Sequence, residues 1–226
     1  MTYAALAAGT NKYYSQPILI SSTTANSVAS SVTTVSRTID ATKVGKIAIY
    51  SFIKGNTAVP STTPTAQGWT LISNLGSQFF VWYKIITSVE SNAVITWTGA
   101  TPAAGIINYF DGVSSVSQFD TSATTQTTSA SVTVNLPAIT TVGANTTIIH
   151  LAGKSHTSTI SQALTTPSGD TLNVGTNTIL TSFSNVNIMS ARRYRSTAGL
   201  VAATSCSSTS SGTGYGVTIA LKSENP

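Results

Sequence analysis

The stretch GWTLISNLGSQFFVWYKII, residues 68–86, decides the fold class of this 226-residue chain. Its second half, FFVWYKII, is apolar on nearly both faces of an extended chain, which is typical of a central strand in a β-sandwich. Burying one aromatic side chain of ~200 Å² at ~25 cal/mol/Å² contributes several kcal/mol to folding. We therefore predict that Trp69, Trp82 and Trp97 are core residues that join two sheets, and not an exposed platform for carbohydrate.

The alternation of apolar and polar residues recurs along the chain. KIAIYSFIK (46–54) places Ile47, Ile49 and Ile53 on one face, and GYGVTIALK (214–222) places four apolar side chains on one face. Charged residues make up only 8% of the chain and Ser and Thr about a third, whereas typical soluble domains carry roughly 25% charged residues. β-branched Thr fits a pleated surface, and no segment combines a helical period with helix caps. These features predict an all-β protein, an antiparallel β-sandwich that is jelly-roll-like.

The chain length favours one sandwich domain over residues 31–226. A faint internal repeat relates two parts of this domain, about residues 40–113 and 140–222. A shift of about one hundred residues places GWTL at 68–71 on GDTL at 169–172. The match rests on a few common residues, and it predicts two related halves that share one core.

Residues 1–30 differ from the rest because they show little alternation and no sizeable apolar face. We interpret them as an extended N-terminal arm or edge strand that becomes ordered against a partner. Adding a strand to the sheet edge of a neighbouring subunit is one mode of binding open to such an arm. Tyr3, Tyr13 and Tyr14 are its candidate partner contacts.

The segment ARRYR contains the one cluster of charge, formed by Arg192, Arg193 and Arg195. On a strand, Arg193 and Arg195 share one face, while Arg192 and Tyr194 share the other. Two interpretations stay open. The arginines discourage stray pairing on a solvated or edge strand, or they contact an acidic patch on a partner protein, for which the planar guanidinium is well suited.

The net charge of +5 comes from few acids, because the other bases are scattered along the chain. Nucleic-acid-binding proteins concentrate their bases on one face, so we expect no nucleic-acid partner. The single cysteine excludes an internal disulfide framework. The first residues lack the features of a signal peptide, and no apolar run approaches the ~20 residues that span a bilayer. We expect synthesis in a cytoplasm and no membrane partner.

The sequence predicts no catalytic, cofactor or metal site. A glycosidase needs two carboxylates about 5 to 10 Å apart, whereas the six acids lie one to a segment, where roles in turns explain them. His150 alternates with Ile149 and Leu151, so we expect it to face solvent, and His156 lies too far along a strand to share a metal with it. Cys206 is expected to be a small buried residue. The six acids are Asp40, Glu90, Asp111, Asp120, Asp170 and Glu224.

A longer pattern carries a resemblance to a known family. The order VGKIAIYSFIKG, GWTLI, FFVWYKI, ITWTG and AAGIINYFDGV, followed by a second half that ends in YGVTIALK, resembles a β-sandwich domain of tailed-bacteriophage virion proteins and phage-like bacterial proteins. The resemblance covers about residues 40–222; Val44-Gly45-Lys46 stands where that pattern has an acid, and residues 109–113 contain one extra position. It implies a sandwich fold and a virion context, and it carries over no catalytic residue.

We therefore expect a non-enzymatic structural protein of a tailed-phage virion, made in the host cytoplasm and without a cofactor. A capsid decoration or cement protein on the head is the leading expectation. Its partners would be the major capsid protein and other copies of itself in a homo-oligomer. Two alternatives stay open: a tail-fibre or receptor-binding protein that recognises host surface glycans, and a secreted carbohydrate-binding or adhesion module.

Overall fold

The structure is a computed structural model that describes residues 16–23, 28–156, 164–175 and 186–224. Nearly all of its regular structure is β-strand, and the described residues contain no α-helix. The one helical element is the single 3₁₀ turn η1 (Pro64–Gln67), which ends at Gly68 with a φ of 81°. Glycine adopts this left-handed conformation without steric cost.

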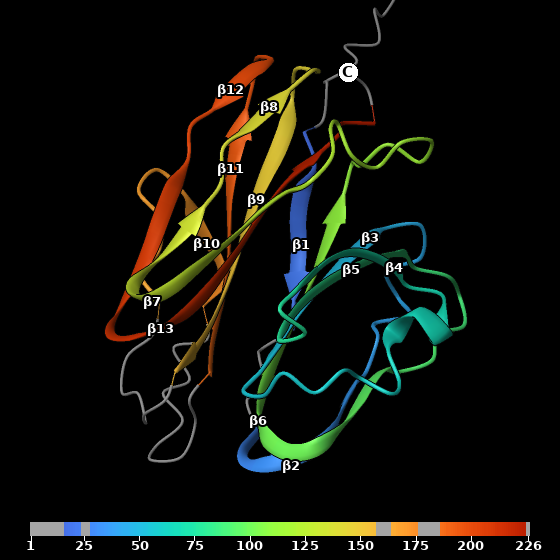
Figure 1. Cartoon of the computed structure of the whole chain (residues 1–226). Coiled ribbons are helices and arrows are strands. Elements are labelled where there is room, and N and C mark those ends of the chain that lie inside the picture. Colours follow the sequence, from blue (N-terminus) through green and yellow to red (C-terminus); the bar gives the residue numbers. More distant parts are fainter. Residues whose placement is uncertain (1–15, 24–27, 157–163, 176–185, 225–226) are drawn as a thin grey trace, which may run out of the picture.

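Two antiparallel sheets make up the molecule (Figure 1). Sheet 1 has the order β1-β6-β3-β5-β4, with β2 also paired to β6, and sheet 2 has the order β10-β11-β9-β13-β7. A further two-stranded ribbon pairs β8 with β12. The strands of sheet 1 are β1 (Ile18–Ser22), β2 (Val28–Arg37), β3 (Ile47–Lys54), β4 (Thr70–Leu75), β5 (Phe79–Ile85) and β6 (Ala93–Asp111). The others are β7 (Thr124–Leu136), β8 (Ile139–Thr141), β9 (Thr146–His156), β10 (Thr171–Gly175), β11 (Val186–Arg195), β12 (Gly199–Val201) and β13 (Thr204–Leu221).

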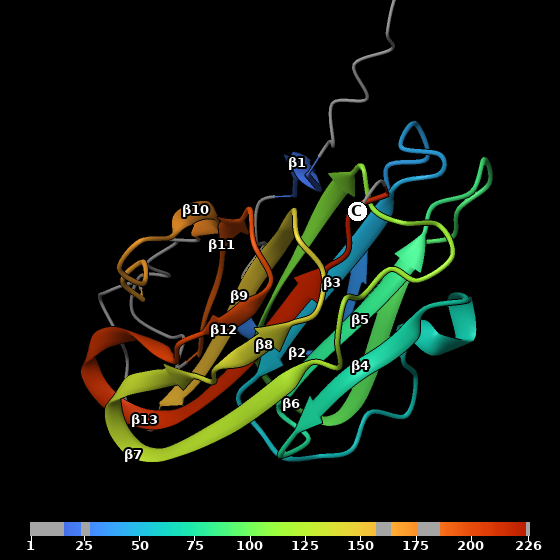
Figure 2. The ribbon, with the colours of Figure 1, turned by 90° about the horizontal axis from the view of Figure 1, so that it is seen from above.

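The two sheets stack face to face, as the two views in Figures 1 and 2 show. The core between them contains the isoleucines that the β3 pattern predicted, and these pack against the apolar face of β9 and β13. On β13, this face consists of Tyr215, Val217, Ile219 and Leu221, as alternation predicted. The predicted all-β antiparallel sandwich is confirmed, and its jelly-roll-like detail stays a prediction.

The same strand order occurs in both sheets. The path β6-β3-β5-β4 of sheet 1 corresponds to β13-β9-β11-β10 of sheet 2, in the same chain order. The edge pairing is interrupted by a register shift at the same place in both, between Leu71 and Ser73 and between Leu172 and Val174. Gly169 has the same φ of 81° as Gly68. This order supports the hypothesis of two related halves, which stays a prediction.

A second hydrophobic cluster lies on the outer face of sheet 1, and it contains all three tryptophans. Trp82 alternates on β5 with Val81, which belongs to the core between the sheets. Strand β2 pairs with the first part of β6, and both contribute residues to this outer cluster. The prediction that the tryptophans are buried is confirmed, but the prediction that they join the two sheets is wrong.

The described part of the N-terminal segment is paired with the rest of the chain. Ile18–Ser22 forms β1, which pairs with β6 of the same chain, and Thr147 Oγ1 donates a hydrogen bond of 2.6 Å to the carbonyl of Pro17. Ile18–Ser22 therefore forms an edge strand of sheet 1 within its own chain, and the interpretation of residues 1–30 as an arm stays a prediction. Tyr3, Tyr13 and Tyr14 lie outside the described residues.

Candidate functional site: a basic pocket beside β11

A buried ionic cluster connects β9, β11 and the turn before β10. Asp170 accepts hydrogen bonds from Arg193 Nε at 2.8 Å through Oδ1 and from His150 Nδ1 at 2.5 Å through Oδ2. The side chains of His150 and Asp170 are fully buried. Arg193 also donates through Nη2 to the carbonyl of Ser168. We call His150, Asp170 and Arg193 the Asp170 cluster.

This cluster corrects one expectation and extends another. His150 was expected to face solvent, but it is buried because further residues cover the outer face of sheet 2 as well. Alternation placed His150 on the correct face and could not show what covers that face. Asp170 does follow a turn, but its carboxylate also connects the side chains of His150 on β9 and Arg193 on β11.

A pocket of about 530 Å³ lies beside this cluster, between β1 of sheet 1 and β11 of sheet 2. We call it the basic pocket. Two of the three arginines that the sequence singled out line it, while Arg195 does not. The side chain of Tyr194 is exposed at its rim, and Tyr194 Oη donates a hydrogen bond of 2.5 Å to Asn145 Oδ1. The lining residues are Gln16, Pro17, Ile18, Leu19, Thr147, Gly169, Thr171, Arg192, Arg193 and Tyr194.

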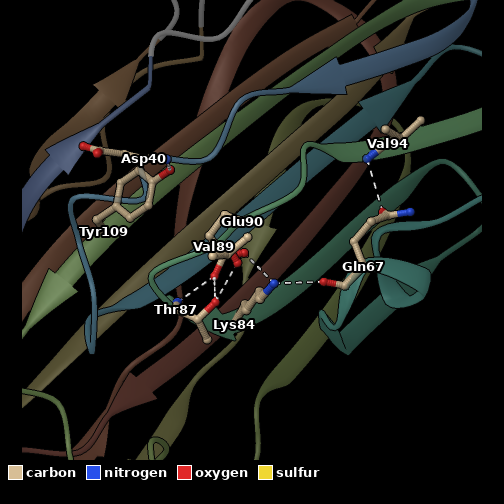
Figure 3. Close-up of polar contacts among 8 residues, drawn as sticks. All are labelled: Asp40, Gln67, Lys84, Thr87, Val89, Glu90, Val94 and Tyr109. Carbon is tan, nitrogen blue, oxygen red and sulfur yellow. Dashed lines mark hydrogen bonds and ion pairs between the residues drawn. The ribbon is translucent and has the colours of Figure 1, made fainter.

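Sheet 1 contains an ion pair at the corresponding position (Figure 3). Lys84 Nζ donates to Glu90 Oε2 at 2.5 Å and to the carbonyl of Gln67 at 2.9 Å. Arg193 in sheet 2 makes the same two kinds of contact, with Asp170 and with the carbonyl of Ser168. Gln67 and Ser168 each precede a glycine with a φ of 81°. The two bases therefore hold equivalent turns against equivalent strands.

Glu90 is fixed from several sides. Its Oε1 accepts hydrogen bonds from Thr87 N at 2.6 Å and from Thr87 Oγ1 at 2.9 Å. Burial raises the pKa of Glu90, but the hydrogen bonds from Lys84 and Thr87 outweigh burial and leave the pKa below its usual value. Figure 3 also shows Asp40, whose backbone N–H donates to Tyr109 Oη at 2.9 Å. These contacts link the loops to sheet 1 and hold the carboxylate of Glu90 in a buried, fully paired position.

Three further acids hold turns, as predicted. Asp40 accepts from Thr42 Oγ1 at 2.6 Å, and this hydrogen bond lowers the pKa of Asp40. Asp111 accepts from Lys46 Nζ at 2.6 Å, which lowers the pKa of Asp111. Asp120 accepts two backbone N–H groups of the loop after β8, at 2.5 and 2.8 Å. Only Glu224, exposed near the C-terminus, remains of the six acids.

Two lysines are fully buried at corresponding ends of the central strands β3 and β9. Lys54 Nζ donates to the backbone and side-chain oxygens of Asn56 at 2.7 and 2.9 Å, and burial lowers the pKa of Lys54 to about 8. Lys154 Nζ donates to Ser208 Oγ at 2.9 Å and to the carbonyl of Ser210 at 2.8 Å. Burial lowers the pKa of Lys154 as well. Neutral oxygens satisfy both amines, which are shielded from solvent.

Cys206 and His156 are buried beside Lys154. Burial raises the pKa of the Cys206 thiol to about 12, which keeps the thiol protonated and unreactive at neutral pH. Burial and then the charge of Lys154 lower the pKa of His156 to about 4. Cys206 is the small buried residue that was predicted. Within the described ranges, no three His, Cys, Asp or Glu side chains gather in a position to hold a metal ion.

The three tryptophans are buried, as predicted, and do not form the sugar platform that was weighed against a core role. Trp69, Trp82 and Trp97 are at most 2% exposed, so none offers a ring face to a ligand. Among the aromatic side chains of the described residues, Tyr194 is the most exposed, at 43%. The most exposed aromatic side chain of the described residues therefore lies at the basic pocket.

The chain matches no protein-family model, no curated protein and no solved structure. No helix in the described part of the chain is both long and apolar enough to span a membrane. The sequence indicated the arginine strand but not the Asp170 cluster. The internal repeat was the usable signal. It aligns Asp170 of the second half with the core residue Trp69 of the first half, and so it marks a position where an acid replaces a tryptophan.

Proposed function

We propose that this protein is a non-enzymatic structural component of a tailed-phage particle. Its role would be to decorate the capsid by binding the major capsid protein and further copies of itself. The sequence resemblance supplies the virion context, and the contacts of the acidic side chains support the non-enzymatic role.

The observation that carries the proposal is the engagement of five of the six carboxylates in internal contacts. A general acid or base has to reach its substrate directly or through one water. The carboxylates of Glu90 and Asp170 are fully buried and already paired, and Asp40, Asp111 and Asp120 hold turns. A rigid sandwich with a Ser- and Thr-rich exterior fits a coat protein better than a catalyst.

The test is quantitative mass spectrometry of purified particles, combined with cryo-electron microscopy. We expect hundreds of copies per particle, located on the head. A handful of copies at the tail would instead support the tail-fibre or receptor-binding alternative. Absence of the protein from purified particles would overturn the proposal and favour the secreted module.

The arm contributes a separate test, because a deletion of residues 1–15 retains β1 and its pairing with β6. We expect that a variant lacking residues 1–15 folds like the full chain and loses binding to particles from which the protein has been stripped. The matched control replaces Tyr3, Tyr13 and Tyr14 with serine in the full chain. Undiminished binding by both variants would exclude the arm as a contact.

A further inference from the structure

We propose that residues 3–8 of a second copy of this chain add a strand to the outer edge of β4 and fill an apolar groove beside it. This inference rests on the proposed function, which includes binding to further copies of the chain, and it names the surface that each copy would use. Three features carry it: the open edge of β4, the apolar groove and the composition of the first eleven residues.

Strand β4 forms one edge of sheet 1, with β5 on one side and no further strand of the described residues on the other. Its sequence, TLISNL, contains no charged residue and no proline, although such residues commonly keep edge strands from pairing with other chains. A register shift between Leu71 and Ser73 is the one irregularity in its pairing with β5, and it limits an added strand to a short run. The unpaired backbone groups of this edge are a template for strand addition.

The apolar groove lies where the core between the two sheets opens beside β4. It has a volume of about 500 Å³, and none of its lining residues is charged. The side chains of Ile72, Tyr83, Phe119 and Ala123 are among those that line it, and all four also pack against the core between the sheets. Successive side chains of an added strand point to opposite faces of the sheet, so every second one would enter the groove and extend this core.

The apolar groove is already formed in the single chain. The ring of Phe119 contacts the ring of Tyr83 edge to face, with centroids 4.8 Å apart. The backbone at this point is fixed to β13, because Phe119 forms a β-bridge with Leu221. In addition, Asp120 N donates a hydrogen bond of 2.9 Å to the carbonyl of Ala220. A site that is ordered in advance loses less conformational entropy on binding, which favours affinity.

The composition of the N-terminal residues fits this surface. Residues 1–11 contain no charged side chain, and residues 3–8 read YAALAA, with Leu6 among small alanines. The alanines let an added strand approach β4 closely, while Leu6 supplies apolar area that the groove can remove from water. An apolar segment and an uncharged groove therefore complement each other.

The place of β1 in the sheet favours a second copy over the same chain as the source of this segment. Strands β1 and β4 lie at opposite edges of sheet 1, as Figure 2 shows. Four strand spacings of ~4.8 Å each separate these edges, so a segment that returned to its own β4 would have to cross the whole sheet. Between copies, the segment that precedes β1 of one chain meets the β4 edge of the next. Such a head-to-tail contact repeats and builds rings or open rows of subunits.

The experiment is sedimentation velocity of the purified full chain, without particles, over a range of concentrations. We expect the wild type to associate. Leu6→Asp and Ala123→Glu should each weaken the association about tenfold or more, because each places a charge in an apolar contact. Ala138→Glu is the matched control, since Ala138 is also partly buried but lies beyond the other end of β7 and outside the groove. This control should leave the association unchanged.

A mixture of two variants tests the head-to-tail contact itself. The Leu6→Asp chain keeps an intact groove, and the Ala123→Glu chain keeps an intact N-terminal segment. Neither should associate alone at the concentration at which the wild type does, whereas their equimolar mixture should form one-to-one dimers. Thermal melts identify a variant that fails to fold, and Thr121→Glu, at another lining position of the groove, then replaces Ala123→Glu.

Three outcomes would overturn the inference: a wild type that stays monomeric up to its solubility limit, a mixture that forms no dimer, and a control that weakens the association as much as Ala123→Glu does. The first would also result from a segment that occupies the groove of its own chain. Mass spectrometry of particles remains a separate measurement of the proposed function. Abundant copies on the head together with a purified chain that does not associate would refute this inference alone, and absence from particles would refute the proposed function.

Discussion

The two sheets use different side chains to cover equivalent positions on their outer faces. On the outer face of sheet 1, Trp69 contacts Tyr50 edge to face, with ring centroids 5.9 Å apart, and Tyr50 also packs against Trp82 at 5.6 Å. In sheet 2, the residue that follows the equivalent glycine is Asp170, and its partner on the central strand is His150. Ala191 of sheet 2 occupies the position that Trp82 occupies in sheet 1, because Ala191 pairs with His150 as Trp82 pairs with Tyr50.

This difference shows that a shared strand arrangement does not fix the chemistry that covers it. Aromatic rings close sheet 1 with large apolar surfaces that have no charge to titrate. An ionic cluster closes the equivalent place in sheet 2 and leads to an arginine at the surface. The candidate site therefore lies beside sheet 2, where charged side chains stand in place of the aromatic rings of sheet 1.

Removing a ring from sheet 1 should have the largest effect. Trp82 is 1% exposed and stacks on Phe80 with centroids 5.3 Å apart, so Trp82→Ala should lower the free energy of unfolding by about 3–5 kcal/mol. Chemical denaturation followed by circular dichroism measures this change. The half-exposed neighbour Tyr83→Ala is the control and should cost clearly less. Equal losses in the two variants would refute the aromatic closure of sheet 1.

Breaking the ionic cluster of sheet 2 should come next. Asp170→Asn leaves Arg193 and His150 without their carboxylate, so we expect a loss of roughly 3 kcal/mol in the free energy of unfolding. Glu90→Gln removes the acid that pairs with the single base Lys84 of sheet 1, and its cost should be smaller. A larger loss for Glu90→Gln than for Asp170→Asn would contradict the central place given to the Asp170 cluster.

The close approach of backbones distinguishes the sheets in a third way. A Cβ at Gly216 would lie 2.0 Å from the backbone carbonyl oxygen of Asn135, whereas one at Gly105 would lie 2.8 Å from the ring of Tyr50. Since a ring edge moves more easily than a paired strand, Gly216→Ala should cost about 2–3 kcal/mol and Gly105→Ala about 1. The reverse order in denaturation experiments would show that sheet 2 is the more adaptable.

The last effect is absent at neutral pH and should appear only in acid. The pKa of His156 is lowered to about 4 in the folded protein, from an ordinary value of 6.5. Between these values the unfolded chain binds a proton that the folded protein does not, so stability falls as pH drops through this window. Above pH 6.5 the two states bind equally and no effect is expected.

His156→Gln isolates this contribution, because it removes the titrating group and leaves the acids unchanged. Its free energy of unfolding should fall less than that of the wild type between pH 6.5 and pH 4, as measured by urea denaturation at each pH. Parallel pH profiles for the two proteins would show that burial does not suppress the protonation of His156.

The sequence predicted the strands well, because alternation and β-branched residues report which side chains share a face. It predicted the inward faces of β3 and β13 residue by residue. It could not predict what covers the second face of a sheet, since that depends on strands distant in the chain. Trp82 and His150 show this limit. Trp82 was predicted to lie between the sheets and lies on the outer face of sheet 1, whereas His150 was placed on the correct face but was expected to meet solvent. Both side chains lie under cover that only the tertiary structure supplies. The basic pocket depends on the approach of β1 to β11, which are about 170 residues apart in the chain, and no local pattern reports such a contact.

The quenching of tryptophan fluorescence by acrylamide tests most directly whether the rings close the outer face of sheet 1. All three tryptophans are at most 2% exposed, so the folded protein should be quenched weakly and the urea-unfolded protein strongly. Strong quenching of the folded protein would place at least one indole at the surface, and it would contradict the closed aromatic face of sheet 1.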